Sequence, residues 1–373
     1  MMVMPRLILA PMEGLIDDVM RDTLTRIVGP QAYTHAVTEF ARVTETRLPM
    51  RFFTRISPEL LNAGCTPAGT RVRVQLLGSD PLRMAESAAQ LAQLNPPGID
   101  LNFGCPAPTV NRHRGGAALL DEPELLHRIA REVRQAVPAH IPYTAKMRLG
   151  VRDASCAREC AGALADGGIE ELVVHARTKL DGYRPPAHWP AIARVAESVK
   201  IPVVANGEIW SVADWQRCRA ESGAGDVMLG RGAVADPLLV SRIQRAAAGE
   251  AASSPHEDWP RLLPHIAHFW QRVRAKVEAR HAPGRLKQWL YLLERNYPQA
   301  ARLMAEVRAV RSAVEIEAIL RCYAVPLALS HHEERRPLDA EPAHDRACGV
   351  ETRTHSAFQR GGIVGCNVIA GEQ

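Results

Sequence analysis

Eight short apolar runs recur along the chain, with segments of helical period between them. The runs are rich in β-branched and other apolar residues, and they span residues 6–12, 33–38, 71–78, 98–104, 143–150, 171–177, 202–208 and 226–232. Strands that are apolar along nearly their whole length are typical of parallel sheets buried on both faces. The pattern therefore predicts an α/β protein built on a parallel sheet.

The segments between the runs indicate how that sheet is covered. Residues 81–94, 123–137 and 188–199 carry apolar side chains three and four positions apart, as an amphipathic helix does. Eight βα units within about 250 residues are the number and length of a TIM (β/α)8 barrel. We expect this fold over residues 1–249, in preference to a doubly wound sheet, with its site at the C-terminal ends of the strands.

The rest of the chain differs in composition from the predicted barrel. Residues 246–258 are small, polar and proline-containing, which predicts a linker. Four segments of helical period follow, and they predict a small helical bundle domain over residues 258–323. Residues 324–373 show no period and few large apolar side chains, so we expect a disordered tail there.

Composition excludes several classes of protein. No apolar run approaches the roughly 20 residues that cross a bilayer, and the N-terminal stretch lacks the pattern of a signal peptide, so we expect a cytoplasmic protein without membrane contact. The eight cysteines are scattered without a CxxC pair, which predicts neither a disulfide framework nor a metal site. A formal net charge of +5 is mild and identifies no partner by itself.

Polar residues gather at the ends of the predicted strands, where a barrel builds its site. The motifs LAPMEG, RVQLLG, DLNFGCP, AKMRLG, VVHART, ANGEIW and LGRG supply Met12, Gln75, Asn102, Cys105, Lys146, His175, Asn206, Glu208, Gly230 and Arg231. We expect all of them to face one mouth.

Two of these motifs indicate an anionic ligand. Gly230 and Arg231 follow the last predicted strand and offer backbone N–H groups and a guanidinium to a phosphate. Lys146 can stand against a developing anion. A phosphorylated cofactor would suit both, although the glycine could serve backbone geometry alone and the lysine could belong to a buried ion pair.

The motifs PMEG, NFGCP, KMRLG, VHARTKLDGY, ANGEIW and GRG, in this order, resemble the tRNA-dihydrouridine synthases. These are flavin enzymes with a TIM barrel followed by a helical domain, and the resemblance covers about residues 5–322. RLKQWLYLL at 285–293 and TEFARV at 38–43 resemble the C subfamily, which acts on uridine 16 in the D-loop of tRNA. The resemblance implies an oxidoreductase that reduces uridine to 5,6-dihydrouridine with FMN, which NADPH or NADH reduces. It implies no protein partner.

The resemblance also assigns cofactor-binding positions. Lys146 would lie beside the N1/O2 edge of the flavin, where a cation stabilises the anionic reduced form. His175 would contact the flavin, residues 206–208 its ribityl side, and Gly230 with Arg231 its phosphate. The full set that it implies is Pro11, Met12, Glu13, Gln75, Lys146, His175, Asn206, Gly207, Glu208, Gly230 and Arg231.

By the same resemblance, Cys105 is the proton donor and Asn102 hydrogen-bonds the uracil. Reduction of the C5–C6 bond needs a hydride at C6, from flavin N5, and a proton at C5 from an acid. A thiol with an ordinary pKa of about 8.5 is mostly protonated at pH 7 and can donate. The alternative is that Cys105 is a small buried apolar residue, the usual place of a free cysteine.

The predicted helical domain favours an RNA substrate. Residues 272–287 and 302–311 are rich in arginine and lysine, which suits phosphates better than a free base. The subfamily resemblance implies that Arg42, Arg285, Lys287 and Arg308 orient tRNA and that Tyr183 lies near the bound nucleotide.

Three alternatives stay open for these residues and for the chain. The basic side chains could be solvated helix faces. The chain could be a flavin dehydrogenase of free pyrimidines, of the dihydroorotate or dihydropyrimidine type, or a non-catalytic RNA-binding barrel. Phe103, within NFGCP, departs from the family motif beside Asn102.

Overall fold

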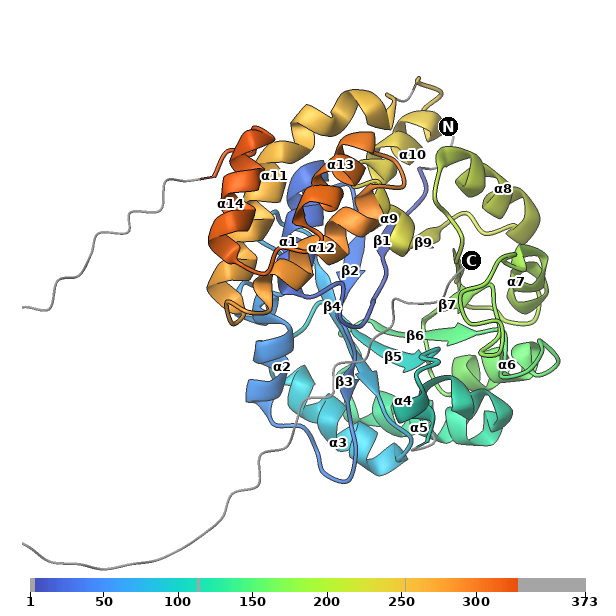
Figure 1. Ribbon diagram of the computed structural model, residues 1–373. Coiled ribbons are helices and arrows are strands. Elements are labelled where there is room, and N and C mark those ends of the chain that lie inside the picture. The colour runs from blue at the N-terminus through green and yellow to red at the C-terminus, as the bar shows by residue number, and fades with distance from the viewer. Residues whose placement is uncertain (1–3, 113–114, 252, 328–373) are drawn as a thin grey trace, which may run out of the picture. The chain divides into compact units, whose positions relative to one another are not determined.

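The strands of the computed structural model form one parallel sheet (Figure 1). The structure describes residues 4–112, 115–251 and 253–327. Within them the strands are β1 (Leu7–Leu9), β2 (His35–Val37), β3 (Ala41–Arg42), β4 (Val72–Leu77), β5 (Ile99–Phe103), β6 (Tyr143–Arg148), β7 (Glu171–His175), β8 (Val203–Asn206) and β9 (Val227–Leu229).

The sheet closes on itself. Its order is β2-β1-β9-β8-β7-β6-β5-β4-β3, and β2 pairs with β4 as well as with β1. β2 pairs with the start of β4, at Val72 and Arg73, and β3 pairs with its end, at Leu76 and Leu77. β2 and β3 therefore occupy one strand position of the barrel, so that the nine described strands fill eight positions. The predicted TIM barrel is confirmed.

Helices follow the strands around the barrel. Asp17, Asp80 and Ser211 each accept a backbone N–H in the first turn of the helix that they precede, which satisfies an otherwise unpaired donor. The α-helices are α1 (Asp18–Val28), α2 (Met50–Ile56), α3 (Pro81–Ala92), α4 (Pro108–Asn111), α5 (Pro123–Ala136), α6 (Ala157–Asp166), α7 (Trp189–Ala196), α8 (Val212–Ser222), α9 (Arg231–Ala235) and α10 (Leu239–Ala247). Two 3-10 helices, η1 (Pro58–Leu61) and η2 (Gly116–Asp121), interrupt the loops.

Four further helices follow α10, as the sequence predicts. They are α11 (Pro255–Lys276), α12 (Ala282–Leu293), α13 (Pro298–Val307) and α14 (Ala313–Cys322). The polar stretch predicted as a linker over residues 246–258 is shorter than expected at both ends. The reason is that α10 continues to Ala247, while Ser254 caps α11 and Pro255 occupies its first turn, where proline is tolerated.

The helical segment packs on the barrel. α11 contacts α1, α12 contacts α9, and both regions belong to one compact unit that ends at Leu327.

The boundary between a barrel domain and a helical domain near residues 249–258 stays a prediction. The expected tail over residues 324–373 lies, from residue 328 on, outside the described residues. None of the described helices combines the length and the apolar character that crossing a membrane requires.

A buried charge network joins the barrel to the helical segment. Arg242 on α10 donates to Asp236 at 2.8 Å and to Asp258 on α11 at 2.7 Å, and Tyr297 donates to Asp236 at 2.9 Å. The Arg242 side chain is 6% exposed. Because both carboxylates are buried, the arginine is needed to compensate their charge.

We expect Arg242→Ala to destabilise the protein strongly. Removing one member of a buried ion pair costs about 3–5 kcal/mol, because the remaining charge stays buried without compensation. Urea unfolding measures the change in the free energy of unfolding. The matched control is Arg245→Ala, which removes an exposed pair with Glu250 and should cost at most about 1 kcal/mol. Equal effects of the two substitutions would contradict the role of Arg242.

Candidate active site

The strand register places polar side chains inside one part of the barrel. Lys146 stands level with Asn102 on β5 and with Val173 on β7. One level higher, Arg148 stands beside His175, which stands beside Asn206. Since residues two apart on a strand share a face, these side chains point to the same interior.

The other part of the interior is apolar. Ile8, Val37, Val173, Val204 and Met228 belong to a small apolar cluster that is separate from the large core between strands and helices. The sequence therefore divides the barrel interior into an apolar part and a polar part, which lies over β4 to β8.

A hydrogen-bond chain runs through this polar part. Thr144 donates to Asp100 at 2.6 Å, Gln75 donates to Asp100 at 2.7 Å, and Asn102 donates to Gln75 at 2.7 Å. All four side chains are buried, and burial raises the pKa of Asp100. Asp100 was not predicted, although its spacing of two from Asn102 places both on one face of the strand.

The chain of hydrogen bonds ends at the loop that carries Cys105. The Asn102 side-chain oxygen accepts from the backbone N–H groups of Gly104 and Cys105, both at 2.9 Å. The Cys105 carbonyl accepts from Asn111 at 3.1 Å and from the backbone of Ala117 at 3.0 Å. The cysteine is thus held from both sides at the C-terminal end of β5.

Lys146 reaches the mouth without a partner. Among the described residues its ammonium has no hydrogen bond or ion pair, and the side chain is only partly exposed. Burial, and then the nearby Arg148, lower the pKa of Lys146 to about 7, against opposing effects of Asp100 and Cys105. An anion bound here would favour the charged lysine.

His175 is neutral in this environment. It is buried, and burial followed by the surrounding cations, Arg148 first, holds its pKa well below the ordinary value. Gly207 lies against its ring, with φ at +114°, and a Cβ on Gly207 would approach the His175 ring to 2.6 Å. Glycine is therefore required at this position.

Two buried arginines that were not predicted, Arg148 and Arg177, organise the loops. Arg148 donates to the carbonyls of Gly104 at 2.8 Å, Thr178 at 2.9 Å and Gly182 at 2.8 Å. Arg148 thus joins the Cys105 loop to the loop after β7. Arg177 pairs with Glu208, whose other oxygen accepts from Trp210 at 3.1 Å.

Arg231 lies between two aromatic rings. Its guanidinium is 4.9 Å from the Tyr183 ring centre and 5.1 Å from that of Trp210. Arg295, from the turn after α12, covers Trp210 at 4.2 Å. No carboxylate forms an ion pair with Arg231 within the described part of the chain, so the guanidinium can bind an anion. Trp210 and Arg295 were not predicted, because nothing in the sequence shows that they stack.

The loop after β1 approaches the turn after β9. Met12 is partly buried, and its sulfur would lie 3.7 Å from a Cβ on Gly230. Pro11 is also partly buried, while Glu13 is exposed. Partial loss of hydration, and then repulsion by Glu39, raise the pKa of Glu13 to about 7.

Asn206 completes the predicted cofactor set. Its side-chain amide donates to the carbonyl of Met228 at 2.8 Å, which ties the end of β8 to β9. The structure therefore brings the predicted cofactor residues, Asn102 and Cys105 to the same end of the barrel.

The residues predicted to orient tRNA are more dispersed. Arg42 is partly buried and donates to the Thr109 carbonyl at 3.3 Å, and Arg308 is exposed at the end of α13. Lys287 donates to the carbonyls of Arg308 and Val310. Arg285 pairs with Asp17. Three of the four cations, Arg42, Lys287 and Arg285, are therefore engaged within the protein.

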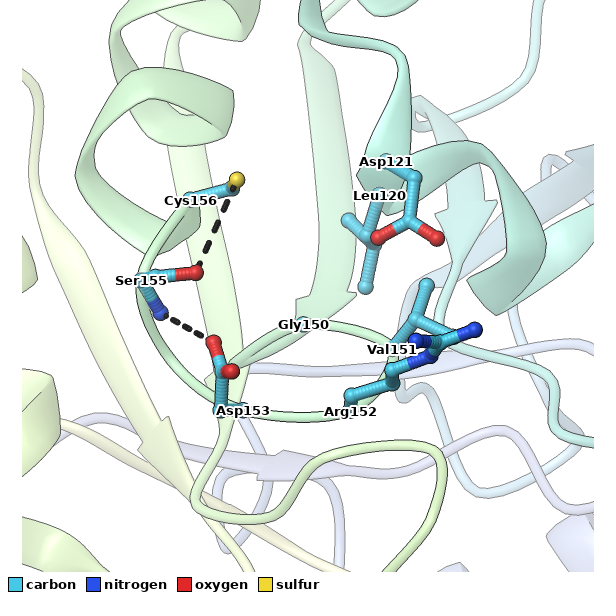
Figure 2. Close-up of a pocket in the computed structure, with 8 residues that line it drawn as sticks. All are labelled: Leu120, Asp121, Gly150, Val151, Arg152, Asp153, Ser155 and Cys156. Atoms are coloured by element: carbon cyan, nitrogen blue, oxygen red, sulfur yellow. Dashed lines mark hydrogen bonds between the residues drawn. The ribbon is translucent and has the colours of Figure 1, made fainter.

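A cavity of about 240 Å³ lies beside the loop after β6. Figure 2 shows the residues that line it. The cavity is separate from the residues considered so far, because none of them lines it. Its walls are Leu120, Asp121, Gly150, Val151, Arg152, Asp153, Ser155 and Cys156.

The low pKa of Lys146 predicts a pH dependence of stability. In the unfolded chain the lysine has its ordinary pKa of 10.5, so between pH 10.5 and 7 the unfolded state binds the extra proton. The ligand-free protein should lose stability as pH falls through this window, by at most about 1.4 kcal/mol per pH unit. Lys146→Met removes this contribution.

Urea unfolding of both proteins at pH 7, 8 and 9 measures it. The free energy of unfolding of the parent minus that of the variant should rise with pH. Parallel pH curves would show that the lysine titrates normally.

Known proteins resemble this chain over most of its length. The family model described as dihydrouridine synthase (Dus) matches residues 8–324. The tRNA-dihydrouridine(16) synthase of Cupriavidus necator is 56% identical over 317 residues, which are 85% of this chain and 97% of that protein. The protein of the same name from Pseudomonas putida is 55% identical over 312 residues, 84% and 95% of the two chains.

More distant proteins also match. The tRNA-dihydrouridine(16) synthase of Neisseria meningitidis serogroup A is 47% identical over 319 residues, 85% of this chain and 94% of that one. A solved 2-naphthoyl-CoA reductase complex matches with a TM-score of 0.48 and 11% identity, over 66% of this chain and 50% of that one. The family match spans both the barrel and the helical segment, and by it this chain belongs to the dihydrouridine synthase family.

Proposed function

We propose that this protein reduces uridine to 5,6-dihydrouridine in the D-loop of tRNA, at position 16, with FMN as cofactor and NADPH as reductant. Its relatives are named tRNA-dihydrouridine(16) synthase, and this chain matches them over nearly their whole length. The observation that carries the proposal is that Lys146 and Arg231, neither of which has an ion-pair partner among the described residues, meet the Cys105 loop at one end of the barrel.

The residues at the mouth fit FMN. The mouth holds an excess of cations, and Lys146 and Arg231 in particular have no ion-pair partner among the described residues. A phosphate and an anionic flavin ring would supply the missing negative charge. The residues that would hold the cofactor are Pro11, Met12, Glu13, Gln75, Lys146, His175, Asn206, Gly207, Glu208, Gly230 and Arg231.

When bound and reduced by NADPH, FMN supplies the hydride that C6 of uracil receives. The Cys105 thiol holds the proton that C5 takes up, and its fixed backbone places the sulfur at the end of β5. Asn102 keeps one side-chain N–H beyond its bond to Gln75, and this group orients a uracil carbonyl. Lys146 holds its proton beside the bound anion, which raises its pKa from about 7.

The exposed charge of the helical segment supports an RNA substrate. Four arginines there are exposed and have neither an ion-pair partner nor an aromatic ring contact within the described residues: Arg272, Arg302, Arg308 and Arg311. Free arginines can bind phosphates, whereas a free pyrimidine would not need them. With Arg42, Tyr183 and Lys287 they are our candidates for the tRNA-binding surface.

We expect Arg231→Ala to lose most of its FMN. The substitution removes a charge-assisted hydrogen bond to the phosphate, which contributes about 1.5–3 kcal/mol, or roughly tenfold or more in affinity. Flavin released from the purified protein and identified by mass gives the occupancy. Arg217→Ala, at an exposed pair with Glu221 on α8, is the control and should keep full occupancy. Full occupancy in Arg231→Ala would remove the arginine from the cofactor site.

We expect Cys105→Ala to separate the two halves of the reaction. Reduction of FMN by NADPH should proceed, because the thiol has no part in it. Reduction of uridine should slow by about 10²- to 10⁴-fold, because the acid for C5 is lost. Cys105→Ser should rescue poorly, since a hydroxyl is a much weaker acid.

The measurement is single-turnover oxidation of pre-reduced enzyme by unmodified tRNA, with dihydrouridine at position 16 counted in the product. Free uracil and dihydroorotate are offered to the same preparation. Turnover of these and not of tRNA would replace the proposed function by that of a pyrimidine dehydrogenase. An alanine variant as fast as the parent would make Cys105 a packing residue.

A further inference from the structure

The ring of Trp210, in the loop after β8, is contacted by two arginines from different parts of the chain. Arg231, the first residue of α9, lies 5.1 Å from the ring centre, and Arg295, from the turn after α12, lies 4.2 Å from it. A guanidinium over an aromatic face is attracted to it, and tryptophan is the strongest partner. The ring therefore links the helical segment to the turn after β9.

Trp210 is held at its backbone and at its side chain. Its backbone N–H donates to Asp214 on α8 at 3.1 Å, and its indole N–H donates to Glu208 at 3.1 Å. The other carboxylate oxygen of Glu208 pairs with Arg177, which is buried. The protein thus fixes the position of the ring without a ligand.

The loop that carries Trp210 lies against the start of α9. A Cβ on Gly232 would approach the carbonyl oxygen of Ile209 to 2.0 Å, far inside van der Waals contact. Glycine at 232 is what lets the two segments come so close. Their contact keeps residue 210 beside residue 231.

Arg231 depends on its rings for a fixed orientation. No carboxylate pairs with it within the described part of the chain, and a long side chain that is free to move loses entropy when it binds an anion. The Tyr183 ring lies 4.9 Å away but is 46% exposed, whereas Trp210 is partly buried and hydrogen-bonded. Trp210 is therefore the firmer of the two supports.

The charges around Trp210 favour an anion beside Arg231. Burial lowers the pKa of Arg231, Tyr183 and Glu208 oppose this effect, and Arg177 and Arg295 lower the pKa further. The guanidinium stays charged, so the neighbouring arginines repel it. A bound phosphate would offset this repulsion.

We propose that Trp210, covered by Arg295, is a positioning residue that holds the Arg231 guanidinium in place for the phosphate of the cofactor. The inference rests on the proposed function, since FMN supplies that phosphate. Because Trp210 acts through Arg231, its effect requires both the guanidinium and a ligand that carries a phosphate.

The test compares affinity for FMN with affinity for riboflavin, which lacks the phosphate. Both are measured by flavin fluorescence on protein stripped of flavin, without RNA. The variants are Trp210→Leu, Trp210→Phe, Arg295→Met, Arg231→Ala and the combination of Trp210→Leu with Arg231→Ala. Arg219→Met is the matched control, because Arg219 contacts another tryptophan, Trp215, at 5.1 Å within α8.

We expect Trp210→Leu to bind FMN about tenfold more weakly and riboflavin as the parent does, because only the group that binds the phosphate is freed. Trp210→Phe keeps a ring and should recover part of the FMN affinity. Arg295→Met should weaken FMN binding about threefold, and Arg219→Met should match the parent. In Arg231→Ala, adding Trp210→Leu should cost no further FMN affinity, since the group that it positions is already absent.

Equal losses of FMN and riboflavin affinity in Trp210→Leu would overturn the proposal and make Trp210 a support of the loop alone. Unchanged FMN affinity, or additive losses in the combined variant, would overturn it as well. If Trp210→Leu does not fold, Arg295→Met and its combination with Arg231→Ala decide by the same comparison. A parent that binds neither flavin would refute the proposed function and this inference with it, whereas a parent that binds FMN beside unaffected variants would refute the role of Trp210 only.

Discussion

The hydrogen-bond chain inside the barrel is the constraint on which the candidate site depends. It passes from Thr144 through Asp100 and Gln75 to Asn102, and from there to the backbone of Cys105. A buried polar side chain without partners costs free energy, so these groups either satisfy one another or destabilise the fold. Because the chain ends on backbone N–H groups of the loop, the barrel interior fixes where the thiol lies.

The electrostatic state of the mouth follows from a shortage of acids. Arg148 is compensated by backbone carbonyls, and Arg177 pairs with Glu208. Lys146 and Arg231 have no ion-pair partner among the described residues. Burial first, and then the surrounding cations, Lys146 and Arg231 among them, lower the pKa of His175. The positive charge makes the mouth a site for an anion, which in a dihydrouridine synthase we propose to be FMN.

Much of the fold could be predicted because its signals are local. The eight apolar runs contain strands of the barrel, since a strand buried on both faces must be apolar along its length. The residues at the strand ends were found for a related reason, because parallel strands of a barrel bring those ends together. The linker was misjudged: a capping serine and a proline at 254 and 255 start a helix within polar sequence.

Contacts between distant segments could not be predicted. Arg148 and Arg295 look like any surface arginine in the sequence, yet one is buried among carbonyls and the other covers Trp210. Arg285 stands in a motif whose resemblance implies a contact with tRNA. In the structure its guanidinium makes four contacts within the protein, which the motif did not indicate. Which partner a long charged side chain finds depends on the packing of helices far apart in the chain.

The sequence by itself determined the barrel, the order of its strand-end motifs and the family, because hydrophobic period and short motifs are properties of neighbouring residues. The tertiary structure alone decided which cations are free to bind a ligand and which are already satisfied. Lys146 and Arg285 illustrate the division, since both stand in recognisable motifs. Only the folded chain leaves the first without an ion-pair partner among the described residues and gives the second Asp17, because charge compensation is settled by distances that the fold creates.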